Sequence, residues 1–341
     1  MPKTDHYALV VGINDYTPVA EGGLKTLGGA INDANSFEAW LLNPQGGDLH
    51  PANCLKITST TNPLLPIKDQ IDDALETIYR AVRGNGGSAI RFYFYFAGHG
   101  VGVEQDIKDT ALCLAKWSSM RRNLAVSVEK YRNLILLSGI FRQVVFFADC
   151  CRSYLYNVKP EDSVLAFPAT GPYVGSVGSF VGYATQYQDQ SYETENEQSE
   201  MRGIFTRVLL DGLSGSAVNP NGEVDADYLR DYLVIQTPIL AHQNGYKQIP
   251  EAIHSFSAAN PCLFYKVDVT IAATINLTEV RTGIVILYNG DDEETAQLDP
   301  NVTRTFIQQL RKGYYKLVDS VTGQEAYFSV SRNNNNNNVS F

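Results

Sequence analysis

The sequence predicts an α/β protein with a largely parallel central sheet, followed by a small antiparallel β-sandwich. Over the first two thirds of the chain, short and continuously apolar runs alternate with amphipathic helical patterns. Such runs are typical of parallel strands that are buried on both faces. From about residue 265 onward, short strands with Gly and Asn-Gly turns follow one another with little helical pattern, as in a β-sandwich.

Four apolar runs are predicted as buried strands, at 7–13, 89–98, 143–150 and 179–185. Four segments have apolar residues at helical spacing, at 29–43, 67–83, 127–139 and 204–215. Because strands and helices alternate, we expect a mostly parallel sheet flanked by helices.

Three regions are expected along the chain: a main domain at 1–265, a β-sandwich domain at 266–332 and a flexible tail at 333–341. A chain of 341 residues is long enough for one large and one smaller domain. The tail begins with a run of asparagines, a low-complexity sequence that offers no apolar side chains for a core.

Composition excludes several classes of function. The formal net charge is -10 and no cluster of Lys and Arg is visible, which argues against nucleic-acid binding and weakly favours a basic substrate. No apolar run approaches the roughly 18 residues of a membrane span, and the start of the chain lacks a signal peptide's flanks, so we expect a soluble, cytoplasmic protein that binds no membrane. The cysteines are odd in number and show no metal-ligand spacing, so neither disulfides nor a zinc site is expected: Cys54, Cys113, Cys150, Cys151 and Cys262.

A histidine and a cysteine follow two of the predicted strands. His99 comes directly after the strand at 89–98, and Cys151 follows the strand at 143–150. Because ligands bind outside the carboxyl ends of parallel strands, we expect the imidazole and the thiol to come into contact there. In such a pair the thiolate is the nucleophile, and the imidazole lowers its pKa and later protonates the leaving amine.

Strand geometry distinguishes the two adjacent cysteines. Side chains alternate between faces, so Asp149 and Cys151 share one side while Cys150 points to the other. We therefore expect Cys151 to be the nucleophile and Cys150 to be a small buried hydrophobe. The N–H groups of Gly100 and Cys151 are candidate oxyanion-hole donors. A purely structural role for the His and the Cys stays open on these residues alone.

Taken together, several motifs resemble the caspase, metacaspase and paracaspase superfamily of cysteine proteases. They are "VVGINDY", "LGGAINDA", "FAGHG" and "DCCR", followed by "GYATQYQDQSYE" and "GIFTRVLLDGL". They occur in the family's order between about residues 6 and 265, and the interval from His99 to Cys151 matches the roughly 50 residues typical of caspases. The resemblance implies a caspase-like fold and a cysteine endopeptidase with a His99–Cys151 dyad.

The same resemblance implies a specificity. In metacaspases and paracaspases an acidic S1 pocket accepts Arg or Lys at P1, and the matching positions here are Asp33 and Asp149. Two carboxylates in one pocket attract a guanidinium strongly, and a helix start near Asp33 favours its ionised form. Two structural alternatives stay open: a helix-capping role for Asp33 and a buried hydrogen-bonding role for Asp149.

Three positions qualify the resemblance. Ala30 stands where the family often has Cys. Ala97 stands where metacaspases often have Ser, which puts one hydrogen bond to the P1 side chain in doubt. The acidic calcium cluster of many metacaspases is not visible in "VGVEQDIKDTALCL" at 101–114, so we expect calcium independence and no cofactor. Lys159 and Arg202 are the candidate autoprocessing sites.

The resemblance also implies binding partners, and it leaves alternative functions open. The expected partners are protein or peptide substrates with a basic P1 residue, and the β-domain is a candidate for holding the enzyme inactive, for recruiting substrate, or for binding an activating partner or a small-molecule messenger. Bacterial relatives suggest a regulated stress or immune effector. The alternatives are a catalytically silent caspase-like scaffold and a legumain-like or separase-like hydrolase of the wider clan.

Overall fold

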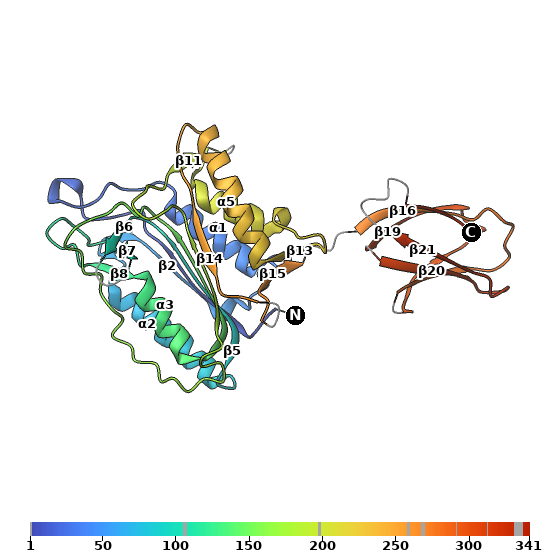
Figure 1. The fold of residues 1–341 in the computed structure, drawn as a ribbon, viewed down its shortest axis with the longest axis horizontal. Helices are drawn as coiled ribbons and strands as arrows, with labels where there is room; N and C mark the ends of the chain where they lie inside the picture. Colours follow the sequence, from blue (N-terminus) through green and yellow to red (C-terminus); the bar gives the residue numbers. More distant parts are fainter. Residues whose placement is uncertain are drawn as a thin grey trace. The chain divides into compact units, whose positions relative to one another are not determined.

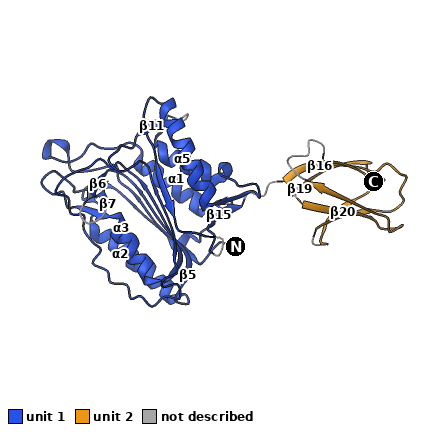
Figure 2. Ribbon diagram, in the orientation of Figure 1, with its two compact units in different colours: residues 1–266 blue, residues 267–341 orange. Residues whose placement is uncertain are grey.

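The protein divides into two compact units, Met1–Lys266 and Val267–Phe341 (Figure 2). This boundary lies close to residue 265, where the sequence changes from alternating strand and helix patterns to a series of short strands. The computed structural model describes residues 2–104, 108–196, 199–257, 260–266, 270–290, 292–311, 313–330 and 337–341.

A six-stranded sheet forms the centre of the first unit (Figure 1). In spatial order its strands are β14 (Glu251–His254), β10 (Gly178–Tyr183), β9 (Phe141–Asp149), β5 (Ala89–Ala97), β1 (His6–Gly12) and β2 (Cys54–Thr58). Only the pairing of β14 with β10 is antiparallel; the other pairs of this sheet are parallel. The expected mostly parallel sheet is confirmed.

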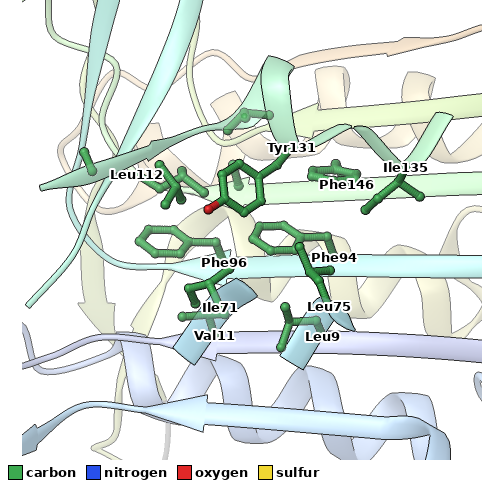
Figure 3. Packing of buried hydrophobic residues seen from close by; sticks show 14 of the residues in the cluster. Leu9, Val11, Ile71, Leu75, Phe94, Phe96, Leu112, Tyr131, Ile135 and Phe146 are labelled. Atoms are coloured by element: carbon green, nitrogen blue, oxygen red, sulfur yellow. The ribbon is translucent and has the colours of Figure 1, made fainter. Parts of the chain in front are cut away.

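Helices cover both faces of this sheet. One face packs against α2 (Lys68–Gly84) and α3 (Val128–Ser138), and the other against α1 (Ala30–Leu42), α4 (Ile204–Asp211) and α5 (Ala226–Gln243). Alternation along β5 produces the two cores, because Phe94 and Phe96 join the first while Tyr95 joins the second. Figure 3 shows the first core, where Phe94 and Phe96 lie near Tyr131 of α3. Within the described residues, no helix is long and apolar enough to span a membrane.

Each of the eight predicted elements is present close to its expected position, and the helix at 204–215 continues beyond α4 as a π-helical turn, Gly212–Ser216. Three elements of the central sheet and its helical layers were not predicted: β2, β14 and α5. The strands β2 and β14 are short and only half-buried, so neither has a continuous apolar run. Helix α5 contains Pro238, a residue that normally interrupts a helix interior.

Smaller elements surround the sheet. They are β3 (Thr60–Thr61), β4 (Leu64–Leu65), β6 (Gly100–Glu104), β7 (Lys108–Cys113), β8 (Ala125–Ser127), β11 (Glu193–Glu195), β12 (Met201–Gly203), β13 (Glu223–Asp225), β15 (Leu263–Lys266) and the 3-10 turns Val19–Glu21 and Pro51–Asn53. Two of these groups matter for the site, because β6 begins directly after His99 and β11 pairs with β12 as a hairpin.

The second unit has two sheets around one apolar core. One contains β19 (Thr305–Arg311), β16 (Thr270–Asn276) and β22 (Asn338–Ser340), and the other contains β18 (Glu294–Leu298), β17 (Val285–Asn289), β20 (Gly313–Asp319) and β21 (Glu325–Val330). Buried residues from both sheets meet in this core, as expected for a sandwich, although β16 and β22 pair in parallel.

The prediction of a flexible tail at 333–341 is wrong for its last residues. Strand β22 pairs with β16, and Phe341 is buried in the sandwich core with Arg281 stacked over its ring. The run of asparagines is followed by Val339 and Phe341, two apolar residues at strand spacing that pack against the sandwich core. The low-complexity sequence before them led to the wrong prediction. Residues 333–336 of this segment lie outside the described residues.

Candidate active site

His99 and Cys151 lie at the same rim of the sheet because β5 and β9 are neighbours. Their parallel register pairs Ala97 with Asp149, and each candidate catalytic residue follows two positions later. The N–H of Gly98 donates to the Asp149 carbonyl at 3.1 Å, which extends the pairing beyond the strand end. A cavity of about 80 Å³ opens there, and His99, Cys151, Asp33 and Asp149 all line it.

Two hydrogen bonds position His99, one made by its imidazole and one by its backbone. Its Nε2–H donates to the Lys25 carbonyl oxygen at 2.7 Å, and its backbone N–H donates to the Tyr16 hydroxyl at 2.8 Å. Because a carbonyl can only accept, Nε2 carries the proton of the neutral ring and Nδ1 is left as the base. Burial lowers the pKa of His99, against the raising effect of the Lys25 carbonyl, so the ring is neutral at pH 7.

Gly98 allows this arrangement. A methyl group at this position would lie 2.5 Å from the Tyr16 hydroxyl oxygen, much closer than real contacts. The glycine before His99 therefore makes room for the tyrosine that holds the His99 backbone. The rings of Tyr16 and His99 pack edge to face with centroids 4.9 Å apart.

The thiol of Cys151 is half-buried and bonded to Ser191. The Ser191 N–H donates to Sγ at 3.4 Å, and the Sγ–H contacts the Ser191 carbonyl at 3.5 Å. Burial raises the pKa of this thiol, the Ser191 N–H lowers it, and the charges of Asp149, Asp189 and Glu193 raise it further. The free protein therefore holds a neutral thiol beside a neutral imidazole.

This result corrects one expectation. The imidazole was expected to lower the pKa of the Cys151 thiol, but burial and the charges of nearby acids raise this pKa, and only the Ser191 N–H is seen to oppose them. The two groups share the cavity, yet no hydrogen bond joins them in the described part of the chain. Cys150 is buried and belongs to the core on the α2 and α3 face, as expected for a small buried hydrophobe, but it also lines the cavity together with Asp149 and Cys151.

The two candidate S1 acids, Asp33 and Asp149, line the same cavity as His99 and Cys151. Asp149 accepts from the Thr206 N–H at 3.1 Å, from the Thr206 hydroxyl at 2.6 Å and from the Ser191 hydroxyl at 2.9 Å. Asp33 accepts from Arg202 Nε at 2.7 Å and from the Gly203 N–H at 2.8 Å. A methyl group on Gly203 would lie 2.3 Å from Asp149 Oδ2 and 2.8 Å from Asp33 Oδ2, so only glycine lets β12 approach both acids.

Burial and mutual repulsion govern the charge of these acids. Burial, then the charge of Asp149, raises the pKa of Asp33 to about 7, although Arg202 and the Gly203 N–H oppose the shift. Burial likewise raises the pKa of Asp149 against its hydrogen bonds from Thr206 and Ser191. The hydrogen bonds of Asp33 go to β12 and not to the first turn of α1, so it does not cap its own helix.

Glu193 is a cavity residue that sequence reasoning missed. Its carboxylate accepts from the N–H groups of Gly28 at 3.1 Å and Gly29 at 3.0 Å, and so caps α1 from 164 residues away. The pair of glycines before the predicted helix could have indicated such a residue. A helix that lacks its own Ser, Thr, Asp or Asn cap has free N–H groups at its start, and these need an acceptor from elsewhere in the chain. Tyr16 and Ser191 were missed as well.

A family model described as the caspase domain matches residues 5–258. The chain belongs to the caspase family. The resemblance drawn from the motifs is confirmed, and so is the caspase-like fold class. A caspase-family protease domain thus carries the His99 and Cys151 cavity.

Individual proteins are similar over much of this caspase domain. A probable protease of a Desulfuromonadales bacterium is 29% identical over 240 residues, which cover 67% of this chain and 28% of that protein. The chain therefore spans about 28% of the length of this curated relative. Among solved structures, protein GSU0716 of Geobacter sulfurreducens has a TM-score of 0.48 and 17% identity, over 77% of this chain and 97% of that one. Caspase-1 of Spodoptera frugiperda has a TM-score of 0.47 and 12% identity, over 74% and 89%.

In this caspase domain, Arg152 fixes the loop that carries Cys151. The guanidinium is buried; its Nε donates to the Thr110 hydroxyl at 2.9 Å, and it stacks 3.9 Å from the Tyr183 ring centre. It also pairs with Glu251 of β14. The residue after the candidate nucleophile therefore ties this loop to β7, β10 and β14.

Two expectations for the caspase domain stay predictions. Gly100 is adjacent to the Cys151 loop, since a methyl group there would lie 2.8 Å from the Cys151 carbonyl oxygen, but Gly100 is not among the residues that line the cavity. Calcium independence concerns 101–114, of which residues 105–107 lie outside the described residues. In the parts of the chain that are described, no group of three or more His, Cys, Asp or Glu could hold a metal ion.

Proposed function

We propose that this protein is a cysteine endopeptidase that cleaves peptide bonds after Arg or Lys, with Cys151 as nucleophile and His99 as general base. The observation that carries the proposal is a single cavity lined by the thiol, the imidazole and the carboxylates of Asp33 and Asp149. A nucleophile, a base oriented by a third group and a charged recognition site are the parts such a reaction needs.

Catalysis begins from the neutral pair. His99 Nδ1 takes the thiol proton as Cys151 Sγ attacks the scissile carbonyl carbon, and the Lys25 carbonyl stabilises the imidazolium that forms. The imidazolium then protonates the leaving amine, which leaves a thioester on Cys151. Water, deprotonated by His99, hydrolyses the thioester and restores the thiol. The N–H groups of Gly100 and Cys151 are the proposed donors to the oxyanion.

Specificity follows from charge. A guanidinium or ammonium entering the cavity meets two carboxylates that are otherwise buried and repel one another, so binding relieves this repulsion. An acidic P1 side chain would add a third negative charge to the same site, at a cost of several kcal/mol. The arrangement therefore favours Arg or Lys and disfavours Asp.

A regulated role belongs to the same proposal. Its support is the family resemblance together with the raised pKa of the Cys151 thiol, which leaves the free protein with little thiolate. The β-sandwich domain is the proposed site for an activating partner or messenger, and the biological setting proposed is a bacterial stress or immune response.

A peptide library with every residue at P1 tests this function. We expect cleavage after Arg and Lys, and the same profile with and without a calcium chelator. Cleavage after Asp would show that the pocket assignment is wrong. No cleavage of any peptide, together with no labelling of Cys151 by an Arg-directed covalent probe, would favour a silent caspase-like scaffold.

A further inference from the structure

One of the two buried carboxylates that line the cavity forms an ion pair with an arginine of the same chain. Arg202 on β12 contacts Asp33 through Nε and Oδ1 at 2.7 Å, with side chains only 12% and 2% exposed. Arg202 is not among the residues that line the cavity. Asp33 lines the cavity and Arg202 does not, so the ion pair joins a cavity residue to a cation outside the lining.

A buried carboxylate pair requires such a cation. Asp33 and Asp149 are 2% and 6% exposed, and both approach the same point beside Gly203. Without a neighbouring positive charge, burial and like-charge repulsion would drive one of the two to take up a proton at neutral pH. Even with Arg202 in place, the pKa of Asp33 is raised to about 7.

The other charged groups around Asp33 do not replace Arg202. Asp149 of β9 and Glu193 of β11 are acids, and Tyr95 of β5 is bonded to the Thr206 hydroxyl. Two further cations belong to neighbouring elements but are engaged elsewhere. Arg207 of α4 donates to the Thr194 hydroxyl, and Lys56 of β2 pairs with Glu38 further along α1. His99 and Cys151, which also line the cavity, are neutral in the free protein.

We propose that Arg202 is a specificity-determining residue, an internal counter-ion that favours the charged form of the Asp33 carboxylate so that a basic P1 side chain binds near neutral pH. The inference rests on the proposed function and assigns a residue that it does not include. Arg202 acts through Asp33 and touches no substrate, so it is a positioning residue.

This role differs from autoprocessing, which the sequence suggested for Arg202. Arg202 pairs with Thr194 in the β11 and β12 hairpin, and the next N–H, that of Gly203, is bound to Asp33. Cleavage after Arg202 would need this side chain to leave Asp33 and the hairpin to open. As a counter-ion, Arg202 instead stays in an intact chain while substrate is cut.

The test compares Arg202→Gln with Arg202→Lys, and uses Arg207→Gln as the matched control. Arg207 donates to the Thr194 hydroxyl of the same hairpin, and within the described residues it has no hydrogen bond or ion pair with either acid. Each variant is assayed with an Arg-P1 peptide from pH 6 to pH 9, with KM and kcat measured separately and melting temperature recorded. Mass spectrometry of the active enzyme checks that the chain is uncut after residue 202.

We expect Arg202→Gln to raise KM at pH 7 about tenfold or more, which is one unit or more of Asp33 pKa, with little change in kcat. The sign follows from the lost cation: the pKa of Asp33 rises further, the carboxyl is protonated at pH 7, and raising the pH restores its charge. KM of Arg202→Gln should therefore fall towards the wild-type value by pH 9. Arg202→Lys and Arg207→Gln should both stay near wild type.

Several outcomes would overturn the inference. A KM of Arg202→Gln that is unchanged, lower than wild type or independent of pH would remove the counter-ion role, and so would chain cleavage after Arg202 in the active enzyme. If Arg202→Gln fails to fold, Arg202→Lys provides the test, because it keeps the positive charge. A KM of Arg202→Lys that differs tenfold from wild type across the pH range, at unchanged melting temperature, would rule out a role based on charge. A wild-type protein that cuts after no basic residue overturns the proposed function as well, whereas a normal wild type with an unaffected Arg202→Gln overturns this inference alone.

Discussion

Cys151→Ala is expected to lower kcat/KM for an Arg-P1 peptide by at least about 10⁴-fold, because it removes the proposed nucleophile that forms the thioester. Cys150→Ala is the matched control, since this second cysteine also lines the cavity but belongs to the core on the α2 and α3 face. That variant should keep kcat/KM within a few-fold of wild type. The measurement is steady-state cleavage of one fluorogenic peptide by both variants at equal concentration.

The same pair of variants can contradict the assignment. A large loss in Cys150→Ala with normal folding, together with activity in Cys151→Ala, would transfer the nucleophile to Cys150. Binding of an Arg-P1 peptide by Cys151→Ala, without turnover, separates loss of chemistry from loss of the site.

Asp33→Asn is expected to lower kcat/KM for Arg-P1 peptides by roughly 10²- to 10³-fold, the cost of removing one partner of a buried charge contact. It also leaves the Arg202 guanidinium without its carboxylate, a repulsive charge next to the incoming cation. Glu38→Gln is the control, because it removes one acid from the same helix at a residue paired with Lys56. That variant should have near-normal activity.

The pH dependence of the wild type gives a second readout for Asp33. With a pKa of about 7, its carboxylate is mostly protonated at pH 6 and mostly charged at pH 8, so kcat/KM for an Arg peptide should rise across this range. The rise attributable to Asp33 should be lost in Asp33→Asn. A variant that loses only thermal stability and keeps full kcat/KM would show that Asp33 has a structural role alone.

Residue order was enough to predict that His99 and Cys151 lie at one rim of the sheet. Long apolar runs ending just before His99 and Cys151 identified two strand ends, and alternation predicted that Cys150 packs in a core, although both cysteines also line the cavity. These features depend on local backbone geometry, which a single sequence carries. That the two strands are direct neighbours, with Ala97 opposite Asp149, came only from the structure.

The remaining features depend on contacts between residues far apart in the chain. The group that orients His99 is the backbone carbonyl of Lys25, which any residue type could supply. Glu193 caps α1 across 164 residues, and Arg202 meets Asp33 across 169. The direction of the Cys151 pKa shift was mispredicted for the same reason, since it depends on burial and on acids such as Asp189 in another loop.

The most direct measurement compares two peptides that differ only at P1, where one carries arginine and the other citrulline. Citrulline has nearly the shape of arginine but no charge, so the ratio of kcat/KM isolates the attraction between the P1 cation and the carboxylates of Asp33 and Asp149. We expect arginine to be favoured by at least about 100-fold, the effect of leaving one buried charge without its partner. Equal kcat/KM for the two peptides would contradict an acidic specificity pocket beside Cys151 and His99.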